Sequence, residues 1–148
     1  MPHREVLRLL DTESVRPFQV VVYYGYFGAG VQALWTGEVP NAVGQILGRT
    51  AHLGWVALLI ACPLLTYLGM RLERRHPAGL WLQIAGGCGI AAASATYVLA
   101  LAQTAYAGQA TFALWVVLAL MFCAIAIVAR DIRKLRAVTL AVRRTAGE

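Results

Sequence analysis

Four long apolar segments, separated by short polar stretches, make up most of the chain. They cover about residues 17–35, 51–70, 80–102 and 111–129. The last two lie within a 54-residue run, His76–Ala129, that contains no Lys, Arg, Asp or Glu. This length suits two membrane-crossing helices of about 20 residues each and a turn. The pattern predicts an all-α integral membrane protein whose four transmembrane helices form a compact bundle.

The polar stretches predict how the spans are connected. The segment 36–49 is long for a turn, and Asn41 can cap a short helical turn that lies on the outer membrane surface. RLERRHPAG after the second span is a short basic turn, and QTAYAGQ separates the third span from the fourth. Pro63 lies near the centre of the second span, where it removes a helix hydrogen bond and is expected to kink the helix.

Composition supports membrane insertion and a single domain. The chain has 148 residues, of which 59% are hydrophobic and 14% are charged, whereas soluble domains have about 25% charged residues. We therefore expect residues 1–148 to form one membrane domain. The charged N-terminal residues lack the pattern of a cleavable signal peptide.

The distribution of positive charge predicts the orientation. Twelve of the thirteen Lys and Arg residues lie in the N-terminal segment, the basic turn and the tail 130–148. By the positive-inside rule both termini of this multi-pass protein are in the cytoplasm and the spans are in the cytoplasmic membrane. Residues 1–16 and the tail are expected to form amphipathic helical ends near anionic headgroups. The residues predicted to contact headgroups are Arg71, Arg74, Arg75, Arg130, Arg133, Lys134 and Arg136. These charges are dispersed beside the spans, so no nucleic acid is expected as a partner.

Small residues indicate where helices approach one another. In the stretch Ala85–Ala95 every residue except Ile90 is small, and small residues allow transmembrane helices to pack closely. Thr96 extends the predicted stripe on this third span, and a face of the first span is its expected internal partner. The predicted helix-packing residues are Gly25, Gly28, Ala85, Gly89, Ala92 and Ala93. The contact can lie within the bundle or between copies of the chain.

The spans offer little reactive chemistry. None contains Asp, Glu, Lys or Arg, and proton-coupled carriers need an ionisable group at membrane depth. The three cysteines are expected to be buried apolar residues, and no catalytic set, metal site or cofactor site is predicted. Gln83, Ser94 and Thr96 are candidates for a polar lining, or they form hydrogen bonds within a packed bundle.

Several strings resemble a known group of proteins. They are VRPFQVVVYYGYFGAG with GEVPNAV, then LGWVALLIACPLL, GLWLQIAGG and ARDIRKL. Together they are similar to small four-span membrane proteins of actinobacterial phages and prophages, some of which are called holins. The resemblance implies homo-oligomers that permeabilise the cytoplasmic membrane.

Three functions are therefore considered, none of them enzymatic. The first is a holin-like protein that self-associates in the membrane and permeabilises it. The second is an accessory or exclusion-type protein that binds another membrane protein without forming a pore. The third is a passive channel or small-solute carrier, based on Gln83 and the Pro63 kink.

Overall fold

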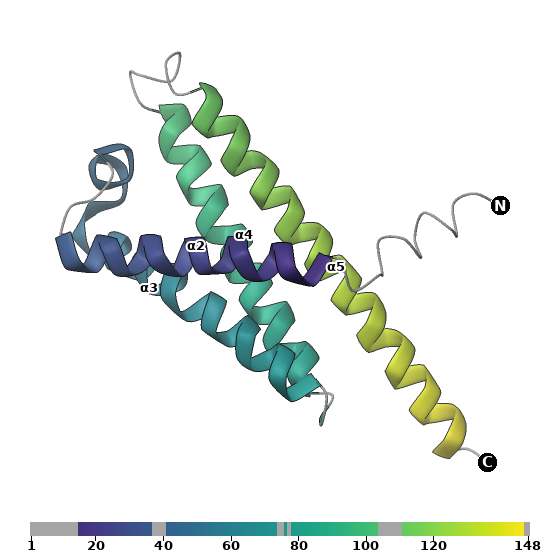
Figure 1. Ribbon diagram of the computed structural model, residues 1–148. Coiled ribbons are helices and arrows are strands. Elements are labelled where there is room, and N and C mark those ends of the chain that lie inside the picture. Colours follow the sequence, from purple (N-terminus) through teal and green to yellow (C-terminus); the bar gives the residue numbers. More distant parts are fainter. Residues whose placement is uncertain (1–14, 37–40, 74–75, 77, 104–110, 147–148) are drawn as a thin grey trace.

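The chain folds as long helices joined by short connections (Figure 1). The computed structural model describes residues 15–36, 41–73, 76, 78–103 and 111–146. The helices within these ranges are α2 (Val15–Thr36), α3 (Asn41–Glu73), α4 (Ala78–Gln103) and α5 (Thr111–Ala146). The predicted N-terminal helix, apart from residues 15 and 16, and the headgroup candidates Arg74 and Arg75 lie outside the described residues.

Three of the helices are long and apolar enough to cross a membrane. These segments are Ala51–Glu73 of α3, all of α4, and Phe112–Leu140 of α5. Their windows have mean hydropathies of 1.9, 1.7 and 2.8. The all-helical, membrane-type architecture predicted from the sequence is confirmed to this extent.

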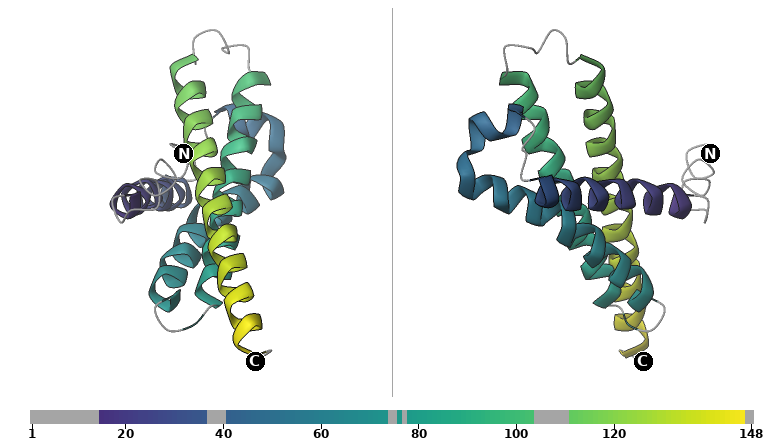
Figure 2. Two further views of the ribbon diagram at one scale, coloured as in Figure 1. Left: turned by 90° about the vertical axis from the view of Figure 1, so that its right-hand side faces the viewer. Right: turned by 60° about the vertical axis from the view of Figure 1, so that its left-hand side comes forward.

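The predicted first span differs from the other three in composition and in direction. Helix α2 has 22 residues, but Gln19, Gln32 and three tyrosines lower its hydropathy, and it is not among the membrane-length apolar segments of the described chain. It lies across the other helices at a steep angle in every view (Figures 1 and 2). The four helices therefore form a layer of three, α3–α4–α5, with α2 crossing one face.

Both ends of α3 extend beyond the predicted span. The helix begins at Asn41, the residue expected to cap a helical turn, and continues to Glu73 without interruption. Its first turns point in a different direction from the rest (Figure 2). Pro63 lies inside the helix, as predicted.

Helix α5 runs continuously from the apolar segment into the basic tail. The 36-residue helix has no break at the predicted span end, Ala129. Its apolar segment is largely exposed, since only 6% of its most apolar window is buried. Phe112, Trp115 and Phe122 are among its large exposed side chains.

The core lies where α2 crosses the layer. Tyr23 of α2, Cys62 of α3, Ile90 of α4 and Ala124 of α5 form a buried apolar cluster. Because each helix contributes one residue, this contact joins all four helices.

Candidate functional site

The closest helix packing is between α3 and α4. A Cβ atom on Gly86 would lie 2.6 Å from the carbonyl oxygen of Cys62 and would also collide with the Thr66 hydroxyl. One on Gly89 would collide with the Cys62 sulfur. The Thr66 hydroxyl donates a 3.0 Å hydrogen bond to the Cys62 carbonyl and is fully buried. Glycine is thus required where the two backbones meet.

The buried side of α4 is not the predicted stripe. Gly89 and Ala93 pack inside the bundle, but Ala85 and Ala92 are exposed. The buried residues instead recur every three or four positions along Gly79, Gln83, Gly86, Ile90 and Ser94. This face includes the bulkier Ile90, which fills the space between the helices where they cross. Of the predicted stripe, Gly89 and Ala93 therefore pack within the bundle, whereas Ala85 and Ala92 face outward, where another copy of the chain can reach them.

The predicted glycine face of α2 does not pack on the third span. Nothing lies within 4 Å of a Cβ atom built on Gly25 or Gly28. The residues of α2 that touch the layer are Gln19, Tyr23, Tyr26 and Gly30, one helical turn apart. Gly30 is the close-packed glycine, because a Cβ there would lie 2.7 Å from Cγ1 of Ile60 on α3. Gly25 and Gly28 therefore lie on the opposite side of α2 from the residues that touch the layer.

The predicted polar lining forms hydrogen bonds within the protein. The Gln83 amide donates to the Glu73 carboxylate at 2.9 Å, which links the start of α4 to the end of α3. Ser94 donates to the Ile90 carbonyl at 2.8 Å and lies 2.8 Å from the Tyr26 hydroxyl. Thr96 donates to the Ala92 carbonyl at 3.0 Å in its own helix. All three polar side chains are therefore hydrogen-bonded within the protein, Gln83 and Ser94 between helices and Thr96 within α4.

A buried carboxylate was missed by the sequence analysis. Asp131 of α5 is 1% exposed. Its Oδ1 accepts a 3.1 Å hydrogen bond from Nε of Arg130 and lies 3.1 Å from Nη2 of the same residue. Arg130, one of the residues predicted to contact headgroups, forms this ion pair with Asp131. The spacing in the sequence indicates this burial. Asp131 lies on the same side of the helix as Val128 and the buried Ala124, at spacings of three and four residues.

Two buried polar side chains of α2, Gln19 and Tyr23, lie beside one another near this carboxylate. The Oδ2 atom of Asp131 has no hydrogen-bond partner within the described part of the chain. Tyr23 lies at the α4–α5 contact, where its hydroxyl oxygen would be 3.9 Å from a Cβ on Gly87, and it interacts electrostatically with Asp131. Polar as well as apolar side chains therefore lie where α2 crosses α5.

An aromatic cluster lies further along α3 and α4. The Trp55 ring stacks on Tyr97 with 6.1 Å between centroids, and the His52 ring is 6.4 Å from Trp55. The indole N–H of Trp55 donates a 3.0 Å hydrogen bond to the Ala93 carbonyl. His52 thus lies among aromatic side chains, and the described residues contain no group of three His, Cys, Asp or Glu that could hold a metal ion.

The outward side of α4 is lined by small residues between two large ones. Ala85, Cys88 and Ala92 are exposed, and they lie between Trp81 and Leu99, which are 63% and 61% exposed. Cys88 carries a free thiol at the middle of this surface. We call these five residues the outward face of α4. Cys123 is also exposed, so only Cys62 matches the expectation that the cysteines are buried.

Comparison with known proteins gives no assignment. No protein-family model, curated protein sequence or solved structure matches this chain.

Proposed function

We propose that this protein is a small, multi-pass, non-enzymatic protein of the cytoplasmic membrane that self-associates and permeabilises that membrane as holins do. The observation that carries the proposal is the outward face of α4. Small side chains facing lipid leave room for another helix to approach closely, and such contacts drive association in membranes. The resemblance to phage-encoded membrane proteins supplies the permeabilising role.

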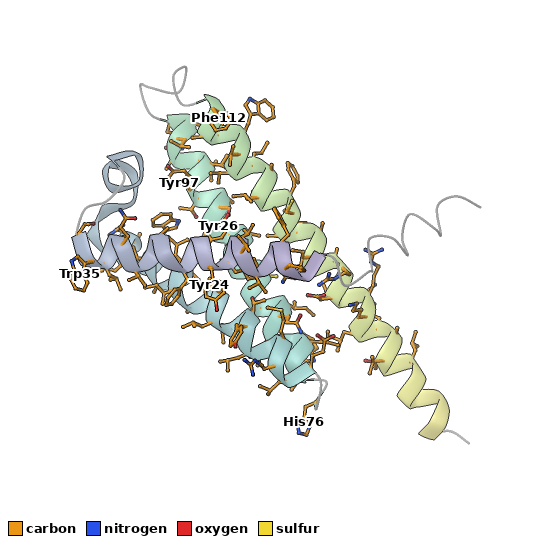
Figure 3. The ribbon with its side chains drawn as sticks, in the orientation of Figure 1. Tyr24, Tyr26, Trp35, His76, Tyr97 and Phe112 are labelled. Carbon is orange, nitrogen blue, oxygen red and sulfur yellow. The ribbon has the colours of Figure 1, made fainter. Side chains whose placement is uncertain are left out.

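The proposed topology has four spans with both termini in the cytoplasm. The end of α3 with His76 and the far end of α5 lie on the same side of the molecule, and Phe112 lies on the other (Figure 3). Positive charge gathers toward the first side, which the positive-inside rule makes cytoplasmic. On α2 the outward residues include Phe18, Val21 and Leu34, whereas the buried ones include Gln19. An apolar outer surface over a polar inner one suits a helix embedded in lipid.

Topology can be tested with single cysteines in a chain whose native cysteines are replaced by serine. A membrane-impermeant thiol reagent added to intact cells should label Thr36→Cys and Thr111→Cys, and should label Ala78→Cys and Ala146→Cys only after lysis. Labelling of Ala146→Cys in intact cells would contradict the proposed orientation. Shielding of Thr36→Cys would contradict the proposal that α2 crosses the membrane.

Native thiols allow a direct test of the self-association surface. Two Cys88 residues can form a disulfide only if their Cα atoms approach to about 4.4–6.8 Å. The variant Cys123→Ser keeps Cys88 and should form covalent dimers in membranes treated with copper phenanthroline and oxygen. Its matched control, Cys88→Ser, keeps Cys123 and should remain monomeric. Equal dimer formation by the two variants would contradict the proposed surface.

Permeabilisation needs a separate measurement. Expression of the chain should admit a membrane-impermeant dye, and Ala92→Leu should delay entry because added bulk on the outward face of α4 keeps helices apart. Ala119→Leu adds the same bulk at an exposed position of α5 and is the control. Dimer formation without dye entry would favour the accessory role and count against a holin-like one.

A further inference from the structure

An apolar groove of about 200 Å³ separates part of α2 from α3. Val20, Tyr24 and Phe27 of α2 form one wall, and Leu64, Tyr67 and Met70 of α3 form the other. Tyr24, Leu64 and Tyr67 are themselves exposed, so the groove is open on the outer surface of the molecule. In a membrane this opening faces lipid.

The groove is a wedge closed at one end. Gly30 of α2 packs directly against Leu59 and Ile60 of α3. The two helices separate from there, because α2 crosses α3 instead of running beside it (Figures 1 and 2). The groove therefore follows α3 from Pro63 toward its last turn, at Met70.

A cation is held at the open end of this wedge. Nη2 of Arg71 donates a 2.5 Å hydrogen bond to the Tyr67 hydroxyl, and the guanidinium carbon lies 5.2 Å from the centre of the Tyr67 ring. Arg71 is exposed, and it forms no ion pair with a carboxylate among the described residues. Most of its N–H donors remain available, and a guanidinium is well suited to bind a phosphate through two of them.

We propose that the groove binds an anionic phospholipid, with one acyl chain between α2 and α3 and the phosphate on Arg71. The walls are mostly aliphatic and aromatic over the length of the groove, which matches a hydrocarbon chain. The single positive charge at its end lies on the side where basic residues concentrate, so it meets the anionic headgroups of the bilayer. This site does not depend on self-association through α4.

The test uses the full-length chain, delipidated in detergent and titrated with phosphatidylglycerol or phosphatidylcholine, with bound lipid counted by native mass spectrometry. One phosphatidylglycerol should bind tightly to the parent chain. Arg71→Gln should weaken this binding about tenfold, the loss expected for a hydrogen bond to a charged group. Arg49→Gln removes an arginine near the start of α3, far along the helix from the groove, and should change nothing. Arg71→Lys keeps the charge but not the paired donors. Its affinity for phosphatidylglycerol should therefore lie between those of the parent chain and Arg71→Gln.

The acyl contact is tested by filling the groove. Leu64→Trp should weaken binding of both lipids, while Leu99→Trp, at an exposed position of α4, should not. Thermal unfolding identifies any variant that fails to fold, and Val20→Trp then replaces Leu64→Trp. Equal affinity of Arg71→Gln and Arg49→Gln would overturn the phosphate contact. Displacement of the lipid by equimolar glycerol phosphate would show that the headgroup alone is bound, and would overturn the acyl site.

Discussion

The hydroxyl oxygens of Tyr26 on α2 and Ser94 on α4 are 2.8 Å apart, although 68 positions separate the two residues in the chain. Ser94 also donates to the Ile90 carbonyl, so Tyr26 is the donor in the pair. This contact is a hydrogen bond between the crossing helix and the middle of the three-helix layer. Interhelical hydrogen bonds in membranes contribute about 0.6 kcal/mol on average and up to about 2 kcal/mol.

A double-mutant cycle measures the Tyr26–Ser94 contact. We expect Tyr26→Phe and Ser94→Ala each to lower the free energy of unfolding in detergent, and the double variant to lose less than the sum. The expected coupling is about 0.6–1 kcal/mol. Strictly additive losses would mean that the hydroxyls do not interact in the folded chain.

Two pairs of glycines should respond to alanine in opposite ways. Gly86→Ala and Gly89→Ala add a methyl group where α4 touches α3, and should each destabilise the fold by about 1–3 kcal/mol. Gly25→Ala and Gly28→Ala place the methyl group in open space on α2. These should stabilise the helix by about 0.5–1 kcal/mol, because glycine loses more backbone freedom on folding. Thermal unfolding in one detergent compares all four, and destabilisation by the α2 variants would show that this face is covered in the assembled protein.

Replacing Arg130 should lower the free energy of unfolding more than replacing its ion-pair partner Asp131. Arg130→Gln leaves a carboxylate that is 1% exposed without its paired guanidinium, and should cost about 3 kcal/mol of unfolding free energy. Asp131→Asn leaves a neutral amide and an arginine that can turn toward headgroups, so we expect a loss of about 1 kcal/mol. Unfolding in graded denaturant distinguishes the two. A larger loss for Asp131→Asn would mean that the carboxylate is not buried.

The aromatic cluster gives a fourth test. Trp55→Phe retains a ring beside Tyr97 but removes the donor that reaches the Ala93 carbonyl. We expect a loss of about 1 kcal/mol in unfolding free energy. Trp35→Phe, which changes an exposed ring at the end of α2, is the matched control and should cost little.

Hydrophobic length and turn residues were sufficient to predict most of the secondary structure. Asn41 begins a helix, the basic turn lies between α3 and α4, and the charge-free run contains α4 and the apolar half of α5. These features depend on local sequence and on the length needed to cross a bilayer. The direction of α2 could not be obtained in this way, because apolar composition carries no information about crossing angle.

The sequence left open which face of α4 packs inside the bundle, and this has a physical cause. On a helix made almost entirely of small residues, Ala85 and Ala92 can pack as well as Gly86 can, so periodicity alone does not distinguish the faces. The contacts with α3 determine which face of α4 packs inside, because the Cys62 carbonyl and the Thr66 hydroxyl leave no room for a side chain at Gly86. Asp131 was missed for a related reason. A charge beside a span was assumed to face headgroups, whereas the helix continues and its phase turns this residue inward.

The unbroken length of α5 has a mechanical consequence. At 1.5 Å per residue its 36 residues extend about 54 Å, well beyond a hydrocarbon core of about 30 Å. The basic half of α5 therefore continues the apolar half as one unbroken helix. Any tilt that the bilayer imposes on the apolar half, by thinning or by crowding, displaces the C-terminal end of α5 by several ångströms.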